Sequence, residues 1–520
     1  MFGNRTIKSC VAKWLCIELQ IHFISVQFRS QLNIVWLSRI ITILMFLRIV
    51  YFNNLFNVYF IFASEFLSKT YFKQLLYRAL LSKKVLFLLQ FSFFFIFGFI
   101  VTLIACPYIF FLFSNNSLIE NYFNLVDNTS LLFSLLTSFL IPFCVYSGRG
   151  LKNYVFYCFV FLLMEINLIA LFLTPNLLLF YCFFEVVTFL MFIVLLNWGY
   201  EVRRSLASFY LFYYTFAASM LFLIGILSIY YLTDSLNFFF LQTFDFTDNQ
   251  QILFWWLFFF AFAVKIPMYP FHIWLPEAHV EAPTGGSILL AGILLKLGFY
   301  GFFRFSLTLF PLANQLFMPV VFTLIILGMI HAMLVSLRQI DAKRIVAYSS
   351  IAHMNFALLG LFAWTLDGVG GSLLVMLGHG LIASGLFFLI GVLYRRYGTR
   401  LLLYYSGLVH AMPFFSIVFF FYILGNVAFP LTFNFPGELL LFLTISTKSK
   451  LLALLSMPVI ILNLINSFLL FIRICFGNLV IYIEQTVDLV FWEFTLNIFL
   501  VVYIIGFGLS PQLIFNLLLT

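Results

Sequence analysis

Charged side chains are scarce in this chain of 520 residues. Asp, Glu, Lys and Arg together make up 9% of the sequence, whereas soluble proteins average about 25%. Hydrophobic residues make up 64%, a balance that excludes a soluble globular fold. Because a transmembrane helix needs about 20 mostly apolar residues, the sequence predicts an all-α polytopic membrane protein.

The sequence also lacks the motifs that hold redox centres and nucleotides. Its seven cysteines stand singly, which is unfavourable for iron–sulfur and zinc sites. It has no P-loop and no G-x-G-x-x-G opening a βαβ unit. The net charge of +9 is scattered along the chain, which favours contact with lipid surfaces over nucleic acid. We therefore expect no cofactor, metal or nucleic acid on this chain, and membrane lipids, cardiolipin among them, as partners.

Apolar runs between polar breaks predict about fourteen transmembrane helices. Before them, residues 1–41 are basic and fit either a transit peptide or an amphipathic extension lying on the membrane. The high phenylalanine content, 76 of 520 residues, is typical of an AT-rich genome such as an organelle's. The predicted spans are 42–64, 85–114, 128–147, 152–174, 176–198, 206–232, 251–280, 284–304, 315–337, 344–363, 370–395, 408–444, 451–474 and 487–509.

Two of these spans, the seventh and the twelfth, are interrupted by prolines. In the seventh, Lys265 ends a long apolar run, and two prolines follow it. In the twelfth, Pro430 and Pro436 precede Glu438. Proline-broken helices in corresponding positions of two halves are typical of inverted-repeat transporters, whose ion sites lie at the breaks. The pattern therefore favours a path for a charged species through the membrane.

Ionisable residues inside apolar spans supply the candidate site. A lysine at the centre of a spanning helix costs roughly 2.5–3.5 kcal/mol on insertion scales, so such residues are rare and usually functional. The alternative for each is structural pairing between helices, and a lone buried histidine is more often a satisfied core residue. Histidine also titrates near neutrality and relays protons. The candidates are Glu165, Glu185, Lys265, His272, Lys296, His353, His379 and Glu438.

Glu185 and Lys265 form the first hypothesis. A carboxylate about 4 Å from an ammonium contributes about 4 kcal/mol at an effective dielectric near 20. If Glu185 approaches and withdraws, Lys265 holds and then releases a proton, with Lys296 as the next acceptor. The remaining polar residues receive no role in this hypothesis. We interpret His279 and His410 as loop-edge residues, His331 as a packing residue, and Asp341, Lys343 and Arg344 as a short loop anchoring a span end.

Three segments of the sequence resemble the antiporter-like subunits of proton-pumping NADH:quinone oxidoreductase, respiratory complex I. The resemblance covers roughly residues 125–475. Glu438 makes the chain resemble one of the three large antiporter-like subunits most, because the other two usually carry a lysine at the second helix break. The chain departs from the family pattern in four ways: no proline follows Glu185, Asn176 stands where aspartate is common, Asn355 follows Met354 where glycine is frequent, and residues 1–80 exceed what is expected before the family core. The segments are FAVKIPMYPFHIWLPEAHVEAPTGGSILLAGILLKLGFYG, RQIDAKRIVAYSSIAHMNF and GHGLIASGLFFLIGVLYRR.

The resemblance implies a fold of fourteen helices with two inverted five-helix repeats and broken helices 7 and 12. It implies a proton channel through Glu185, Lys265, Lys296 and Glu438, with the histidines on the axis between them. The corresponding divisions are an N-terminal extension (1–41), two first helices (42–124), a core with the first repeat (125–304), the second repeat (305–475) and a C-terminal helix (476–520).

The resemblance also implies an enzyme subunit without its own redox centre. FMN, iron–sulfur clusters and quinone are expected in partner subunits, and neighbouring antiporter-like subunits are expected to flank this chain in the membrane arm. The implied location is the mitochondrial inner membrane, with a bacterial or plastid energy-transducing membrane as the alternative. Two other functions stay open at this point: a subunit of a multisubunit sodium/proton antiporter, and a structural scaffold whose buried charges only pair helices.

Overall fold

Ten helices in the described part of the chain are long and apolar enough to cross a membrane. The structure is a computed structural model that describes residues 127–200, 203–478 and 487–519. The extension 1–41 and the predicted spans 42–64 and 85–114 lie outside these residues. The ten are α7 (Asn128–Ser147), α8 (Tyr154–Leu173), α9 (Leu177–Trp198), α10 (Arg204–Thr233), the run Thr284–Leu309, α17 (Pro311–Leu337), α18 (Ala342–Ala363), α19 (Leu366–Tyr397), α23 (Lys450–Cys475) and α24 (Phe491–Leu509).

Two further spans are each broken into two helices, as predicted from their prolines. Short helices occupy several connections and the end of the chain. Every predicted span from 128–147 onward therefore has a helical counterpart, and the all-α membrane fold is confirmed for the described residues. The broken spans are α12 (Asp248–Lys265) with α13 (Trp274–Glu281) and α21 (Pro413–Asn426) with α22 (Asn434–Lys448); the short helices are α11 (Phe238–Thr243), η3 (Leu402–Tyr404), α20 (Leu408–Ala411) and α25 (Gln512–Leu519).

An asparagine side chain binds a main-chain carbonyl at each break. Proline has no N–H to donate and cannot continue a helix, so carbonyl groups near it need other partners, and inside a membrane those must be internal. Asn355 Nδ2 donates to the carbonyl of Pro267 at 3.3 Å. Asn434 Nδ2 donates to the carbonyl of Gly425 at 3.3 Å. The two breaks are thus built alike, while the inverted-repeat relation between the halves stays a prediction.

The run Thr284–Leu309 winds irregularly. Two π-helical turns interrupt it, and such turns are rare and frequent at functional sites. Lys296 lies between the two turns and is fully buried. The segments are α14 (Thr284–Leu289), η1 (Leu290–Leu294), α15 (Leu295–Gly301), η2 (Phe302–Ser306) and α16 (Leu307–Leu309).

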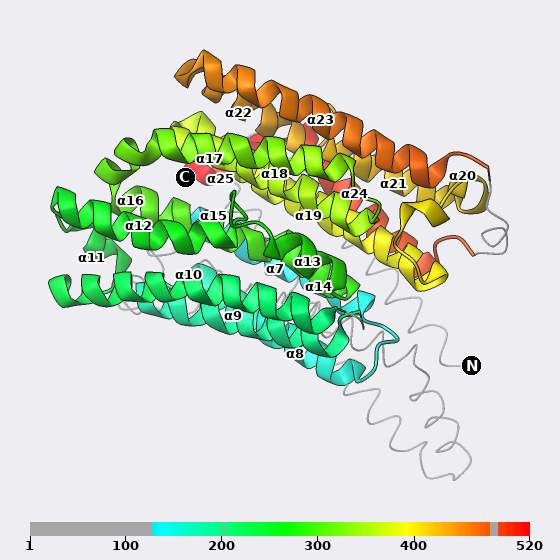
Figure 1. The fold of residues 1–520 in the computed structure, drawn as a ribbon, viewed down its shortest axis with the longest axis horizontal. Helices are drawn as coiled ribbons and strands as arrows, with labels where there is room; N and C mark the ends of the chain where they lie inside the picture. The colour runs from blue at the N-terminus through cyan, green and yellow to red at the C-terminus, as the bar shows by residue number, and fades with distance from the viewer. Residues whose placement is uncertain (1–126, 201–202, 479–486, 520) are drawn as a thin grey trace, which may run out of the picture. The chain divides into compact units, whose positions relative to one another are not determined.

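Three elements make up the centre of the bundle: the run Thr284–Leu309, α18 and α19, each buried along nearly its whole length. Helices α10, α23 and α24 are buried over much less of theirs. In Figure 1, α8, α9 and α10 lie on one side of the central helices, and α22 and α23 lie on the other. The ionisable residues of the central helices are therefore kept away from lipid.

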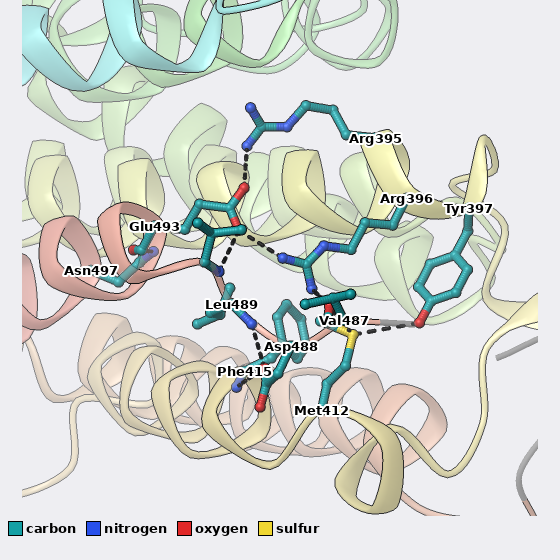
Figure 2. Close-up of polar contacts among 11 residues, drawn as sticks. Arg395, Arg396, Tyr397, Met412, Phe415, Val487, Asp488, Leu489, Glu493 and Asn497 are labelled. Carbon is teal, nitrogen blue, oxygen red and sulfur yellow. Dashed lines mark hydrogen bonds and ion pairs between the residues drawn. The ribbon is translucent and has the colours of Figure 1, made fainter. Parts of the chain in front are cut away.

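Polar contacts tie the C-terminal span α24 to the bundle (Figure 2). The Glu493 carboxylate pairs with Arg395 at 3.2 Å and with Arg396 at 2.7 Å, both at the end of α19. The neighbouring Asp488 carboxylate accepts hydrogen bonds of 2.8 and 3.1 Å from two backbone N–H groups at the start of α21. A carboxylate at a helix N-terminus satisfies N–H groups that have no partner within the helix. Helices α19, α21 and α24 are thereby fixed at one end.

The departures from the family pattern leave α9 intact. This helix, which carries Glu185, runs unbroken from Leu177 to Trp198, as expected without the proline. Asn176 caps it, since its side-chain oxygen accepts from the N–H groups of Leu178 at 2.9 Å and Leu179 at 3.4 Å. Asparagine is as good an N-cap as aspartate, so the substitution keeps the start of the helix.

Candidate functional site: a buried row of ionisable side chains

Lys296 and His379 are in direct contact. Lys296 Nζ lies 3.1 Å from His379 Nδ1 and also donates to the carbonyl of Ala291 in the preceding π-helical turn. Both side chains are at most 1% exposed. Among the described residues no carboxylate lies within ion-pair distance of Lys296. A buried ammonium without a counter-ion is costly, and this favours passing its proton to the imidazole.

His353 continues the row from His379 to Glu438. The two imidazole rings lie 5.6 Å apart between centroids. His353 Nδ1 lies 3.1 Å from Glu438 Oε1, an ion-pair distance at which the two groups are not aligned for a hydrogen bond, and both side chains are largely buried. Lys296, His379, His353 and Glu438 come from α15, α19, α18 and α22. Four of the eight candidate residues therefore form one connected row across four helices.

A fifth residue in the row, Asn463 on α23, was missed at the level of sequence. Its Nδ2 lies 3.3 Å from His353 Nε2 and donates to the carbonyl of Asn426 at 2.8 Å. A cavity of about 20 Å³, measured for the centre of a water molecule, opens beside it, large enough for one water. The cavity is lined by His353, Glu438, Asn463, Met333, Ala352, Phe356, Val459 and Ile460.

The two glycines that flank His379 let its neighbours approach. A Cβ at Gly378 would lie 2.4 Å from Asn434 Oδ1, on the helix that carries Glu438. A Cβ at Gly380 would lie 3.1 Å from the carbonyl oxygen of Gly292, on the run that carries Lys296. Small residues allow helices to pack closely in membranes. The sequence Gly-His-Gly thus places one imidazole between the lysine and the glutamate helices.

Gly378→Ala is expected to destabilise the bundle by about 1–3 kcal/mol, the usual cost of overpacking a core. The reason is that the added methyl group cannot coexist with Asn434 at its present position. Gly506→Ala is the matched control, because a Cβ there meets nothing within 4 Å. The measurement is thermal inactivation of the assembled protein in its membrane. Equal inactivation temperatures for the two variants would contradict the close approach.

Lys265 lies apart from this row, at the end of α12. It is 3% exposed, and its Nζ sits 4.2 Å from the ring centroid of Phe184, the neighbour of Glu185 on α9. No ion pair within 4.0 Å joins Lys265 to Glu185. Glu185 Oε2 instead lies 3.4 Å from Thr188 Oγ1 on its own helix, and Oε1 has no hydrogen-bond partner in the described structure. Lys265 and Glu185 are therefore not paired in this structure.

Glu165 and His272 are buried and also lie outside the connected row. Glu165 on α8 is 1% exposed, and neither carboxylate oxygen has a hydrogen-bond partner among the described residues. His272 lies in the break between α12 and α13, and its ring contacts those of Tyr269 and His331. Within the described ranges, no group of three or more His, Cys, Asp and Glu could hold a metal ion.

Two sequence interpretations were wrong. His279 is fully buried and stacks on Phe387 at 4.6 Å, so it is not a loop-edge residue. Lys343 is fully buried in α18, where its Nζ donates to the carbonyl of Ala282 at 2.8 Å. The Asp341 side chain caps α18 by accepting a hydrogen bond from the N–H of Lys343. The helix therefore begins at Ala342, before the predicted start at residue 344. A short run of charges cannot show by itself where such a cap stands.

Lys343 also lies over an aromatic ring at this end of the bundle. The ring belongs to Tyr200, in the connection after α9, at 4.8 Å. Burial raises the pKa of the Tyr200 hydroxyl. The nearby Tyr394 raises this pKa further, and the charge of Arg400 lowers it. The hydroxyl therefore stays neutral beside two cations. Through these contacts Lys343 joins the start of α18 to Tyr200, after α9, and to Ala282, after α13.

One buried charge was overlooked. Arg304 is 2% exposed and pairs with Asp127 at 3.0 Å. It lies in η2, eight residues after Lys296. The rule that singled out the lysines, a charge inside an apolar run, would have found it. The Arg304–Asp127 pair joins the end of this run to the residue before α7 and includes no member of the connected row.

A family profile and curated relatives both place the chain in one membrane-protein family. The profile of the family described as "NADH:quinone oxidoreductase/Mrp antiporter, TM" matches residues 174–465. The chain is 45% identical over 418 residues to NADH-ubiquinone oxidoreductase chain 4 of Chondrus crispus, covering 78% of this chain and 84% of that one. It is 47% identical over 361 residues to the chain of the same name from Arabidopsis thaliana, covering 69% and 73%.

Two solved structures share the fold. A chain of respiratory complex I from Thermus thermophilus superposes with a TM-score of 0.70 at 28% identity, covering 75% of this chain and 83% of that one. A chain of the Mrp complex from Dietzia gives 0.68 at 21% identity, covering 75% and 82%. The second likeness concerns the fold alone.

Proposed function

Because this chain belongs to the NADH:quinone oxidoreductase/Mrp antiporter transmembrane family, we propose that it is a proton-translocating membrane subunit of NADH–ubiquinone oxidoreductase. Its relatives at 45–47% identity carry the name chain 4 of that enzyme. It is a multi-pass protein of the mitochondrial inner membrane in this proposal. FMN, iron–sulfur clusters and quinone belong to partner subunits, and neighbouring antiporter-like subunits flank it in the membrane arm.

The observation that carries the proposal is the connected row of buried ionisable side chains. A proton on Lys296 Nζ passes to His379 Nδ1 across 3.1 Å, and the imidazole releases the proton on its other nitrogen towards His353. His353 then gives a proton to Glu438 from Nδ1 across 3.1 Å. Each imidazole accepts on one nitrogen and donates from the other. The cavity beside Glu438 is the place where the proton leaves the row.

Lys265 and Glu185 supply the other end of the path in this proposal. When Glu185 approaches, its charge stabilises the ammonium of Lys265, and when it withdraws the proton moves on to Lys296. A contact worth about 4 kcal/mol is large enough to drive that step. Redox chemistry in the partner subunits moves the carboxylate. Glu165 and His272 contribute polarity near this end.

Lys265→Ala is expected to slow NADH-driven proton pumping at least tenfold, within the usual range for losing a proton-transfer group. The assembled complex should keep its reaction with an electron acceptor that works at the flavin. The measurement is pumping by membrane vesicles, with exposed Lys152→Ala as control. A structural scaffold predicts normal pumping in Lys265→Ala and in a double variant with Glu185→Gln, and that result would refute the proposal.

The second candidate is a subunit of a sodium/proton antiporter, because the family description covers Mrp antiporters as well as NADH:quinone oxidoreductases. The same row would then exchange protons against sodium without redox chemistry. Purification of the intact assembly separates the two. Recovery of this chain together with flavin and iron–sulfur clusters supports the oxidoreductase, and recovery of a purely membrane-embedded assembly that exchanges sodium supports the antiporter.

A further inference from the structure

Two histidines meet where the seventh span is broken. His272 is 6% exposed, and its Nδ1 has no hydrogen-bond partner among the described residues. The ring of His331, on α17, stands 5.0 Å from it in a T-shaped contact. Tyr269 completes the group, at 5.8 Å from His272 and 5.5 Å from His331. His331, unlike His272, is exposed on the outside of the described bundle.

The contact is built by close packing. A Cβ at Gly328 would lie 3.3 Å from Tyr269 Cβ and 3.4 Å from its backbone nitrogen, so the glycine lets α17 lie a few tenths of an ångström closer to the broken segment than a larger residue would. His331 follows three residues later and hence points from the same face of α17. His331 therefore faces the break, and part of its side chain stays exposed.

The length of α17 puts His331 near one end of its span. Helix α17 has 27 residues, which gives a length of about 40 Å at 1.5 Å per residue. The hydrocarbon core is about 30 Å thick, so about 5 Å of the helix projects at each end when it is centred. His331 is six residues, or about 9 Å, from the end at Leu337. It thus lies only about 4 Å inside the core boundary.

The neighbours of His331 that lie in the break are aromatic rings. Its contacts among the described residues are the rings of His272 and Tyr269, and no ion pair in the described structure includes it. The nearest ion pair at this end of the break joins Glu277 and Arg344, which neutralise each other at 2.6 Å. The titratable and charged groups on the broken span, α18 and α23 are Asp248, Lys265, Tyr269, His272, Glu277, His279 and Glu281 on the broken span, Lys343, Arg344, Tyr348 and His353 on α18, and Lys450, Arg473 and Cys475 on α23.

We propose that His331 and His272 form a lateral proton-transfer pair connecting the broken seventh span, and through it Lys265, to the membrane boundary at the Leu337 end of α17. The inference rests on the proposed function, since it assigns a route by which Lys265 exchanges protons. His331 accepts a proton from water on one ring nitrogen and releases the proton on its other nitrogen to His272. In the first step an O–H bond of a hydronium ion breaks, water is left, and an N–H bond forms on His331; in the second step an N–H bond of His331 breaks and one forms on His272. No electron is transferred in either step.

The test uses the assembled complex with His331→Ala and His331→Gln. Both variants should assemble, keep flavin-site activity and pump at least about tenfold more slowly. Added imidazole should restore pumping in His331→Ala, because the site is exposed and a free imidazole can occupy it. His410→Ala, at an exposed histidine on the short helix α20, should pump normally and show no response to imidazole.

The pair would be overturned by wild-type pumping in both variants, by slow pumping that imidazole leaves unchanged, or by failure of both variants to assemble, which would mean that the ring only packs. Wild-type pumping in the glutamine variant alone would overturn it too. The proposed function fails separately, through normal pumping in Lys265→Ala. If Lys265→Ala is defective while the His331 variants are normal, only the lateral pair is lost.

Discussion

Lys296→Met is expected to slow proton pumping about a hundredfold or more, the effect typical of removing a proton-transfer group. Methionine fills a similar volume, so packing between the two π-helical turns should be kept. What is lost is the titrating nitrogen 3.1 Å from His379 Nδ1. The row then ends at His379, and no described side chain takes the place of the missing carrier.

Pumping by membrane vesicles and flavin-site activity are measured on the same preparation. Lys450→Met is the matched control, because Lys450 is exposed at the start of α23 and its loss should change neither quantity. Near-normal pumping by Lys296→Met, in vesicles whose complex is fully assembled, would remove Lys296 from the path. A loss of assembly would be visible as a parallel loss of flavin-site activity in the membrane.

Glu438→Gln should have an effect of similar size, about a hundredfold. Glutamine keeps the shape and the hydrogen-bonding capacity of the side chain. It cannot accept the proton that His353 Nδ1 would hand over across 3.1 Å, so the other end of the row is closed while the fold is preserved.

Two companions make this variant decisive. Asp367→Asn, at an exposed acid in the first turn of α19, controls for the loss of one negative charge and should pump normally. Glu438→Asp keeps a carboxylate and should recover part of the rate. If Glu438→Gln pumps like the wild type, the proton leaves the row elsewhere, and the cavity beside Asn463 has no part in the path.

The carriers could be found in the sequence because a charge inside an apolar run is costly in a membrane and therefore rare. Lys296, His353, His379 and Glu438 were chosen in this way, and all four lie in the connected row. Their contacts could not be predicted, since they lie on four helices up to 142 positions apart in the sequence. Only the packing of α18 and α19 against their neighbours brings them together.

What the sequence missed has physical reasons as well. Asn463 contacts His353 but is uncharged. An asparagine in an apolar helix is too common to be singled out from the sequence. Lys343 looked like a loop residue because the cap formed by Asp341 is a matter of geometry. The contact between His331 and Tyr269 could not be predicted either, because it depends on how closely α17 packs against Tyr269 at Gly328.

The central claim is that protons cross the bilayer along one continuous line of side chains, from Lys265 through Lys296 and the two histidines to Glu438. The most direct measurement is a map of the assembled complex at a resolution that shows ordered water. Waters that join Lys265 to Lys296, and one in the cavity at Glu438, are the expected result. Dry, separate pockets around these residues in every conformation of the complex would contradict it.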